Sequence, residues 1–147
     1  MPSRGLPRLP EDDLGRMRSA RRRGHGPRAR RAALHLQVTP EVDVAEGVRL
    51  VEAGAVLLDV REPDEWTAGH APAAVHVPLG SLGSAPVEEW VGRRVVVICR
   101  SGNRSRTATD ALVARGADAL NLVGGMRAWE AHGLPVVTST GDAGRVA

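Results

Sequence analysis

The chain has 147 residues, enough for one domain with a buried core, and 42% of them are hydrophobic. It contains no Phe and no Tyr, so the core has to be built from aliphatic side chains and three Trp. All 20 basic residues are Arg. Ten of them lie in residues 1–36 with only three acids, whereas residues 37–147 carry a net charge of −4. The basic character therefore belongs to the N-terminal part, and we expect no nucleic-acid partner.

Other classes of protein are excluded by what the sequence lacks. No segment approaches the about 20 consecutive apolar residues of a membrane span, and no apolar stretch follows the N-terminal arginines as in a secretory signal. The single cysteine, Cys99, excludes an intramolecular disulfide and a multi-thiolate zinc site. We expect a cytoplasmic protein with no membrane partner, no metal and no cofactor.

Residues 1–34 are rich in Arg, Gly and Pro and show no apolar period. Such a segment cannot bury enough surface to offset the entropy lost on ordering, so we predict a disordered Arg-rich tail. Three interpretations of this tail stay open. It is a solvated appendage, an anion-binding arm, or an over-extended gene start with Met17 as the internal alternative.

From residue 35 the pattern alternates between helices and strands. Thr39 is a candidate helix cap with Pro40 in the first turn, and this helix should run to about Glu52 and end near Gly54. Residues 55–60 form a strand that is apolar on both faces, as in a covered parallel sheet. The remaining predicted elements are a helix at 63–68, a strand at 74–77, a connection at 79–92 with one short helix, a strand at 94–98, a helix at 105–115, a strand at 119–123, a helix at 126–132 and an extended piece at 134–137.

This alternation predicts a single α/β domain at residues 35–137, with a central parallel sheet and helices on both faces. Residues 138–147 are predicted to be a flexible C-terminal tail. In parallel sheets, ligands bind at the carboxyl ends of the strands, and Cys99 lies at such an end. The candidate site is the loop that starts there, made of Cys99, Arg100, Ser101, Gly102, Asn103, Arg104 and Ser105.

The loop has the features of a nucleophile in an anion-binding cradle. A helix N-terminus offers unpaired backbone N–H groups and a partial positive charge, so Cys99 beside two arginines should ionise below the free pKa of about 8.5. Gly102 and Asn103 adopt a positive φ most easily, which lets the loop turn its N–H groups inward. We predict that Ser101 is a hydrogen-bonding residue of the loop and that Ser105 is the N-cap of the next helix.

The length of the loop separates two chemistries. Four residues lie between Cys99 and Arg104, whereas cysteine phosphatases with an arginine loop have five, which would place the arginine at Ser105. A shorter loop encloses a smaller anion-binding site, which suits one sulfur atom better than a tetrahedral phosphate group. Outside the loop, Asp59 ends a core strand and needs a partner, with Arg61 or loop amides as candidates. We predict a structural role near the site for Asp59 and Arg61.

These motifs together resemble the rhodanese family of sulfurtransferases. The loop 99–105 looks like the six-residue active loop and helix start of single-domain members. Residues 59–66 with Gly69, His70 and Pro78 are similar to the N-terminal signature of the family. Gly124 and Gly125, followed by Trp129, Gly133 and Pro135, resemble its C-terminal signature. The resemblance covers residues 36–137.

The resemblance implies a sulfurtransferase that carries sulfane sulfur as a persulfide on Cys99. The donor would be thiosulfate or a similar small molecule, attracted by Arg100 and Arg104. The acceptor would be cyanide or a thiol, either a small molecule or a protein such as a thioredoxin-like reductant. Two alternatives stay open: a sulfur-relay or interaction module without turnover, and a cysteine phosphatase or arsenate reductase on the same fold.

Overall fold

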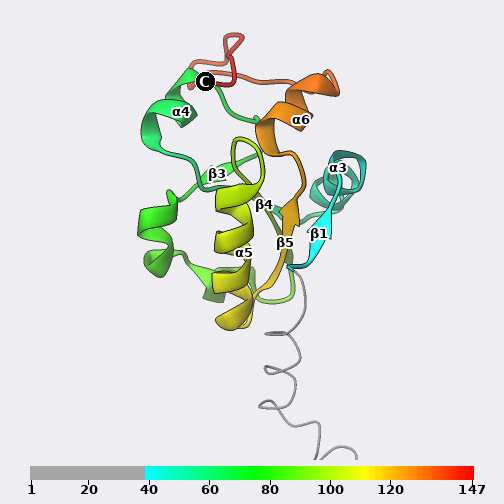
Figure 1. The fold of residues 1–147 in the computed structure, drawn as a ribbon, viewed down its shortest axis with the longest axis vertical. Helices are drawn as coiled ribbons and strands as arrows, with labels where there is room; N and C mark the ends of the chain where they lie inside the picture. The colour runs from blue at the N-terminus through cyan, green and yellow to red at the C-terminus, as the bar shows by residue number, and fades with distance from the viewer. Residues whose placement is uncertain (1–38) are drawn as a thin grey trace, which may run out of the picture. The chain divides into compact units, whose positions relative to one another are not determined.

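The computed structural model describes residues 39–147, so the predicted disordered tail at 1–34 lies outside the described residues. Five strands form one sheet in this part of the chain: β1 (Glu41–Val42), β2 (Val56–Asp59), β3 (Val75–His76), β4 (Arg94–Ile98) and β5 (Asp118–Leu122). All of them are parallel, in the order β1-β5-β4-β2-β3 (Figure 1). The predicted single α/β domain with a parallel sheet is confirmed.

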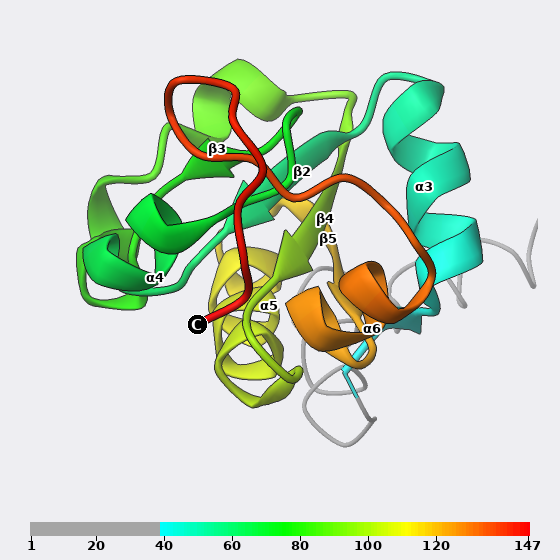
Figure 2. The ribbon, with the colours of Figure 1, turned by 90° about the horizontal axis from the view of Figure 1, so that it is seen from above.

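Helices cover both faces of this sheet. Helices α3 and α6 lie on one face and α5 lies on the other, with the two 3₁₀ segments η2 and η3 beside the sheet on the α5 side (Figures 1 and 2). The sequence predicted one short helix in the connection 79–92, where the structure has η2 and η3. The helices are α3 (Val44–Glu52), α4 (Pro63–Ala68), η2 (Leu79–Ser84), η3 (Val87–Trp90), α5 (Asn103–Ala114) and α6 (Gly125–Ala131).

The sheet is buried on both faces, which explains the unbroken apolar runs of β2 and β4. Successive side chains of a strand point to opposite faces. Val95 and Val97 of β4 therefore pack with Leu112 of α5, whereas Val96 and Ile98 pack on the other face. The core on the α3 and α6 face contains Val44, Leu57, Ala71, Val96, Ile98, Leu122, Met126 and Trp129.

The start of the domain differs from the prediction. Thr39 does not cap a helix, because its hydroxyl donates to the Asp110 carboxylate of α5 at 2.9 Å. The chain continues as β1 and then reaches Asp43, whose carboxylate accepts from the Glu46 N–H at 2.8 Å and caps α3. Glu41 and Val42 were expected in a helix from the local capping pattern, but they form β1 because they pair with β5.

The segment predicted as a flexible C-terminal tail returns to the domain. Val137 forms isolated bridges with His70 and Ala143, where a longer extended piece was expected. The Arg145 N–H donates to the Ala68 carbonyl at the end of α4, and Val146 packs on the α3 and α6 core. Gly69 allows this close approach, since an added Cβ would lie 2.6 Å from the Arg145 nitrogen. Backbone hydrogen bonds therefore join Arg145 to the end of α4 and Gly144 to Val136.

Candidate active site around Cys99

Cys99 directly follows β4 at the carboxyl edge of the sheet and is 1% exposed. The chain then turns at Gly102, which adopts φ +112° and caps α5. Asn103 is already the first residue of that helix, so only Gly102 of the predicted pair supplies the left-handed turn. The prediction that Ser105 is the N-cap is therefore wrong, because the helix begins two residues earlier than expected.

The earlier helix start brings the Ser105 hydroxyl to the cysteine. Cys99 Sγ accepts hydrogen bonds from the Gly102 N–H at 3.1 Å and from Ser105 Oγ at 3.2 Å. Burial raises the pKa of the Cys99 thiol, but hydrogen bonds from Ser105, Gly102 and Ser101 outweigh it, so the pKa lies below its ordinary value. Hydrogen bonding to the sulfur, more than the neighbouring arginines, therefore favours the thiolate.

The first turn of α6 supports the loop from behind. The Met126 N–H donates to the Cys99 carbonyl at 2.7 Å, and the Arg127 N–H donates to the Arg100 carbonyl at 3.0 Å. Gly125 adopts φ +57°, and a Cβ there would meet the Cys99 carbonyl oxygen and lie 2.7 Å from the Arg100 carbonyl carbon. The Gly124-Gly125 turn thus lets the helix reach the backbone of the loop.

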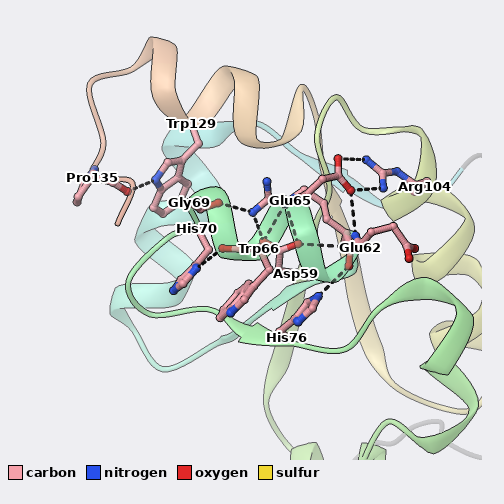
Figure 3. Close-up of polar contacts among 11 residues, drawn as sticks. Asp59, Glu62, Glu65, Trp66, Gly69, His70, His76, Arg104, Trp129 and Pro135 are labelled. Atoms are coloured by element: carbon pink, nitrogen blue, oxygen red, sulfur yellow. Dashed lines mark hydrogen bonds and ion pairs between the residues drawn. The ribbon is translucent and has the colours of Figure 1, made fainter. Parts of the chain in front are cut away.

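The two arginines of the loop have different surroundings. Arg100 is exposed, whereas Arg104 forms a two-point ion pair with Glu65 of α4, at 2.7 and 2.9 Å (Figure 3). The hydrogen bonds from Arg104 are the main cause that lowers the pKa of Glu65 from 4.5 to about 2. The charge of Arg104 is therefore balanced by a carboxylate that was not among the predicted site residues.

Asp59 and Arg61 form a second ion pair behind the site, at the end of β2. Both side chains are fully buried, and Arg61 donates to the Asp59 carboxylate at 2.8 Å and to the Gly69 carbonyl at 2.7 Å (Figure 3). The partner that the sequence suggested for Asp59 is thus the one the structure provides. Arg61 ties the end of β2 to the end of α4.

Three rings stack beside α4. The Trp66 indole is parallel to the rings of His70 and His76, with centroids 3.5 and 4.7 Å apart (Figure 3). His70 hydrogen bonds the Trp66 carbonyl, and His76 hydrogen bonds the Arg61 carbonyl, each at 2.8 Å. Of the three Trp expected in the core, Trp90 and Trp129 are buried, whereas Trp66 is only half-buried. The Trp129 indole N–H donates to the Pro135 carbonyl.

Other parts of the described chain offer no competing centre. A cavity of about 270 Å³ lies at the amino end of β4, beside Trp90, Arg93 and Arg115, at the opposite end of that strand from Cys99. Among residues 39–147, no group of three or more His, Cys, Asp or Glu side chains is arranged to hold a metal ion. In the same range no helix is long and apolar enough to cross a membrane.

Comparison with known proteins identifies the family. A family model described as a rhodanese-like domain matches residues 43–132. The chain is similar to a rhodanese-related protein from Thermoplasma volcanium, with 30% identity over 67% of this chain and 97% of that one, at a TM-score of 0.61. It is also similar to a thiosulfate sulfurtransferase from Pseudomonas aeruginosa, with 28% identity over 79% of this chain and 22% of that one, at a TM-score of 0.63.

A protein from Rhodopseudomonas palustris, described as of unknown function and a possible tyrosine phosphatase, is 22% identical over 76% of this chain and 93% of that one, at a TM-score of 0.59. At that identity the similarity concerns the fold alone. The family model, by contrast, matches more than half of the chain. This protein belongs to the rhodanese-like domain family.

Proposed function

We propose that the protein is a sulfurtransferase that carries sulfane sulfur as a persulfide on Cys99. The observation that carries this proposal is the position of Cys99 Sγ, which accepts hydrogen bonds from the Gly102 N–H and the Ser105 hydroxyl. Donors fixed around a sulfur stabilise negative charge on it, as an oxyanion hole stabilises a charged oxygen. These two donors therefore favour the thiolate that attacks the sulfur donor.

With thiosulfate as donor, the reaction is a double displacement. The Cys99 thiolate attacks the outer sulfur of thiosulfate, the sulfur–sulfur bond of the donor breaks, and sulfite leaves with its electron pair. Cys99 then carries an anionic persulfide. An acceptor such as cyanide attacks the outer sulfur, the persulfide bond breaks, thiocyanate leaves, and the Cys99 thiolate is restored. A thiol acceptor would take the sulfur in the same way.

The surroundings of the loop suggest how an anionic donor is received. Arg100 is exposed and forms no ion pair with another of the residues 39–147, whereas Arg104 forms an ion pair with Glu65. We assign the attraction of the donor to Arg100 and the fixing of the loop against α4 to Arg104. The acceptor must come from another molecule, because the chain has one cysteine. A reducing compartment such as the cytoplasm fits this chemistry, since the lone thiol has to stay reduced.

Thiocyanate production from thiosulfate and cyanide tests this proposal. We expect steady turnover by the full chain and none by Cys99→Ser. A persulfide that forms on Cys99 without turnover would assign the protein to the alternative, a sulfur-relay module. If the full chain hydrolyses an aryl phosphate and Cys99→Ser does not, the result would contradict sulfur transfer. It would favour the alternative that the protein is a cysteine phosphatase. We expect no such hydrolysis, because Ser105 occupies the position where that loop needs an arginine.

A further inference from the structure

The hydroxyl of Ser105 faces two acceptors and has one proton. Its oxygen lies 3.2 Å from Cys99 Sγ and also hydrogen bonds Oδ1 of Asn121, in β5. Ser105 is fully buried and Asn121 is 1% exposed, so solvent supplies no substitute donor. A hydroxyl donates one hydrogen bond at a time. Cys99 and Asn121 therefore compete for the same proton.

Glu41 decides which end of the Asn121 amide faces Ser105. Asn121 Nδ2 donates to Glu41 Oε2 at 3.0 Å, and Arg106 binds the same oxygen at 2.9 Å. An ionised carboxylate only accepts hydrogen bonds, so the amide nitrogen must point to Glu41 and the amide oxygen to Ser105. The register of the sheet creates this contact, because Glu41 of β1 lies opposite Asn121 of β5.

We propose that Asn121 and Glu41 are positioning residues that control the protonation of Cys99 through the Ser105 hydroxyl. In the thiol form, the Cys99 S–H donates to Ser105 Oγ, and Ser105 donates to Asn121. In the thiolate form, the hydroxyl turns to Cys99 Sγ and leaves the Asn121 oxygen without that donor. This inference rests on the proposed function, since it concerns the same nucleophile.

The arrangement opposes premature ionisation of the cysteine. A buried carbonyl oxygen that loses its donor costs free energy, so Asn121 favours the thiol while the loop favours the thiolate. When Cys99 carries a persulfide, its inner sulfur has no charge and the hydroxyl can return to Asn121. Among residues 39–147, two ion pairs lie on the elements beside the loop: Arg104 of α5 with Glu65 of α4, and Arg61 with Asp59 of β2, although Nη1 of Arg61 has no hydrogen-bond partner there. Neither ion pair contacts the Ser105 hydroxyl, so Cys99 and Asn121 are the two acceptors that compete for its proton.

An ultraviolet titration of the thiolate in the full chain tests the proposal. The chain has one cysteine and no tyrosine, so the absorbance change of thiolate formation belongs to Cys99. In Glu41→Leu the Asn121 amide is free to turn, its nitrogen donates to Ser105 Oγ, and the hydroxyl is committed to Cys99. We expect the midpoint of the Cys99 titration to fall by about one pH unit.

Glu41→Gln is the matched control. It removes the same negative charge, but Arg106 still holds the amide oxygen of the new side chain in place, so Asn121 keeps its orientation. We expect the wild-type midpoint. A wild-type midpoint in Glu41→Leu overturns the proposal, and so do equal shifts in both variants, which would indicate a charge effect alone. In Glu41→Leu combined with Ser105→Ala, the midpoint should match that of Ser105→Ala alone.

Asn121→Leu supplies a second route, since it removes the competing acceptor itself and should also lower the midpoint. Glu41 is on the surface, so its variants keep the test available if the buried substitution prevents folding. The titration requires no sulfur donor. A shifted midpoint together with absent thiocyanate production would therefore contradict the proposed function and leave the positioning role standing.

Discussion

Ser105 supplies the side-chain hydrogen bond to the cysteine sulfur, at 3.2 Å, from the first turn of α5. Local sequence rules assign a serine at this place to helix capping. The turn at Gly102 starts the helix two residues earlier, so the hydroxyl points to the sulfur. Its role could not be predicted from the sequence, because it depends on where α5 begins.

Removal of this hydroxyl by Ser105→Ala should raise the pKa of Cys99, because a donor to the charged form is lost. At pH values below the pKa of Cys99, the thiolate fraction and the rate of persulfide formation should be about tenfold lower in Ser105→Ala than in the wild type. At high pH, where Cys99 is ionised in both proteins, the two rates should converge. Single-turnover rates against pH measure this. Ser101→Ala is the control, since Ser101 contributes its backbone N–H to the sulfur. Equal profiles for the wild type and Ser105→Ala would contradict the assigned role.

At the scale of the elements, the Glu65–Arg104 pair joins α4 to the first turn of α5. The pKa of Glu65 is lowered to about 2, so its contribution to stability is present above about pH 4.5 and is lost as pH falls toward 2. Arg104 is 33% exposed, which limits this contribution to about 1–2 kcal/mol.

Glu65→Gln should therefore lower the free energy of unfolding by about 1–2 kcal/mol at neutral pH. The difference from wild type should shrink as pH falls below 4.5. Denaturant unfolding at several pH values measures it. Asp64→Asn, an exposed acid of the same helix, controls for net charge and should leave the stability unchanged at neutral pH. A difference between wild type and Glu65→Gln that is independent of pH would contradict the assigned ion pair.

The contact of α6 with the active loop depends on Gly125. Gly125→Ala would place a Cβ against the Cys99 and Arg100 carbonyl groups, in addition to the strain at φ +57°. Gly133→Ala has similar strain at φ +75° but open space around the new Cβ, so it should cost only about 1 kcal/mol. We expect a larger loss of stability in Gly125→Ala, with slower persulfide formation. Equal losses, with unchanged rates, would show that α6 does not shape the loop.

Elements set by local patterns were predicted well, and those set by distant contacts were not. The strand 94–98 and the helix 63–68 have the predicted limits, because an apolar run and a proline with a following glycine define them locally. Thr39 was misassigned because its partner, Asp110, is 71 residues away. The Glu65–Arg104 pair spans 39 residues and has no pattern along the chain that would reveal it.

At the scale of the whole molecule, the order of the strands assembles the site. β5 lies between β1 and β4, so Glu41, Asn121 and Ser105 meet although 80 residues separate the first two. The position of Cys99 at the carboxyl edge follows from the parallel sheet and was predictable. The network behind it was not, because strand order across the sheet is a tertiary property.

Within residues 39–147, the hydrogen bonds to Cys99 Sγ come from Gly102 and Ser105, and the N–H groups of Met126 and Arg127 in α6 bind the carbonyls of Cys99 and Arg100. We therefore expect that removal of residues 1–34 leaves the rate of persulfide formation unchanged. Single-turnover rates of the full chain and of residues 35–147 measure this. A folded shortened chain that has lost the reaction would show that the Arg-rich segment takes part in it.

The mass of the intact protein after incubation with thiosulfate tests the central claim most directly. We predict a gain of one sulfur atom in the wild type, its loss on addition of cyanide or a thiol, and no gain in Cys99→Ser. The absence of a gain in folded wild-type protein, or an equal gain in Cys99→Ser, would contradict persulfide formation on Cys99.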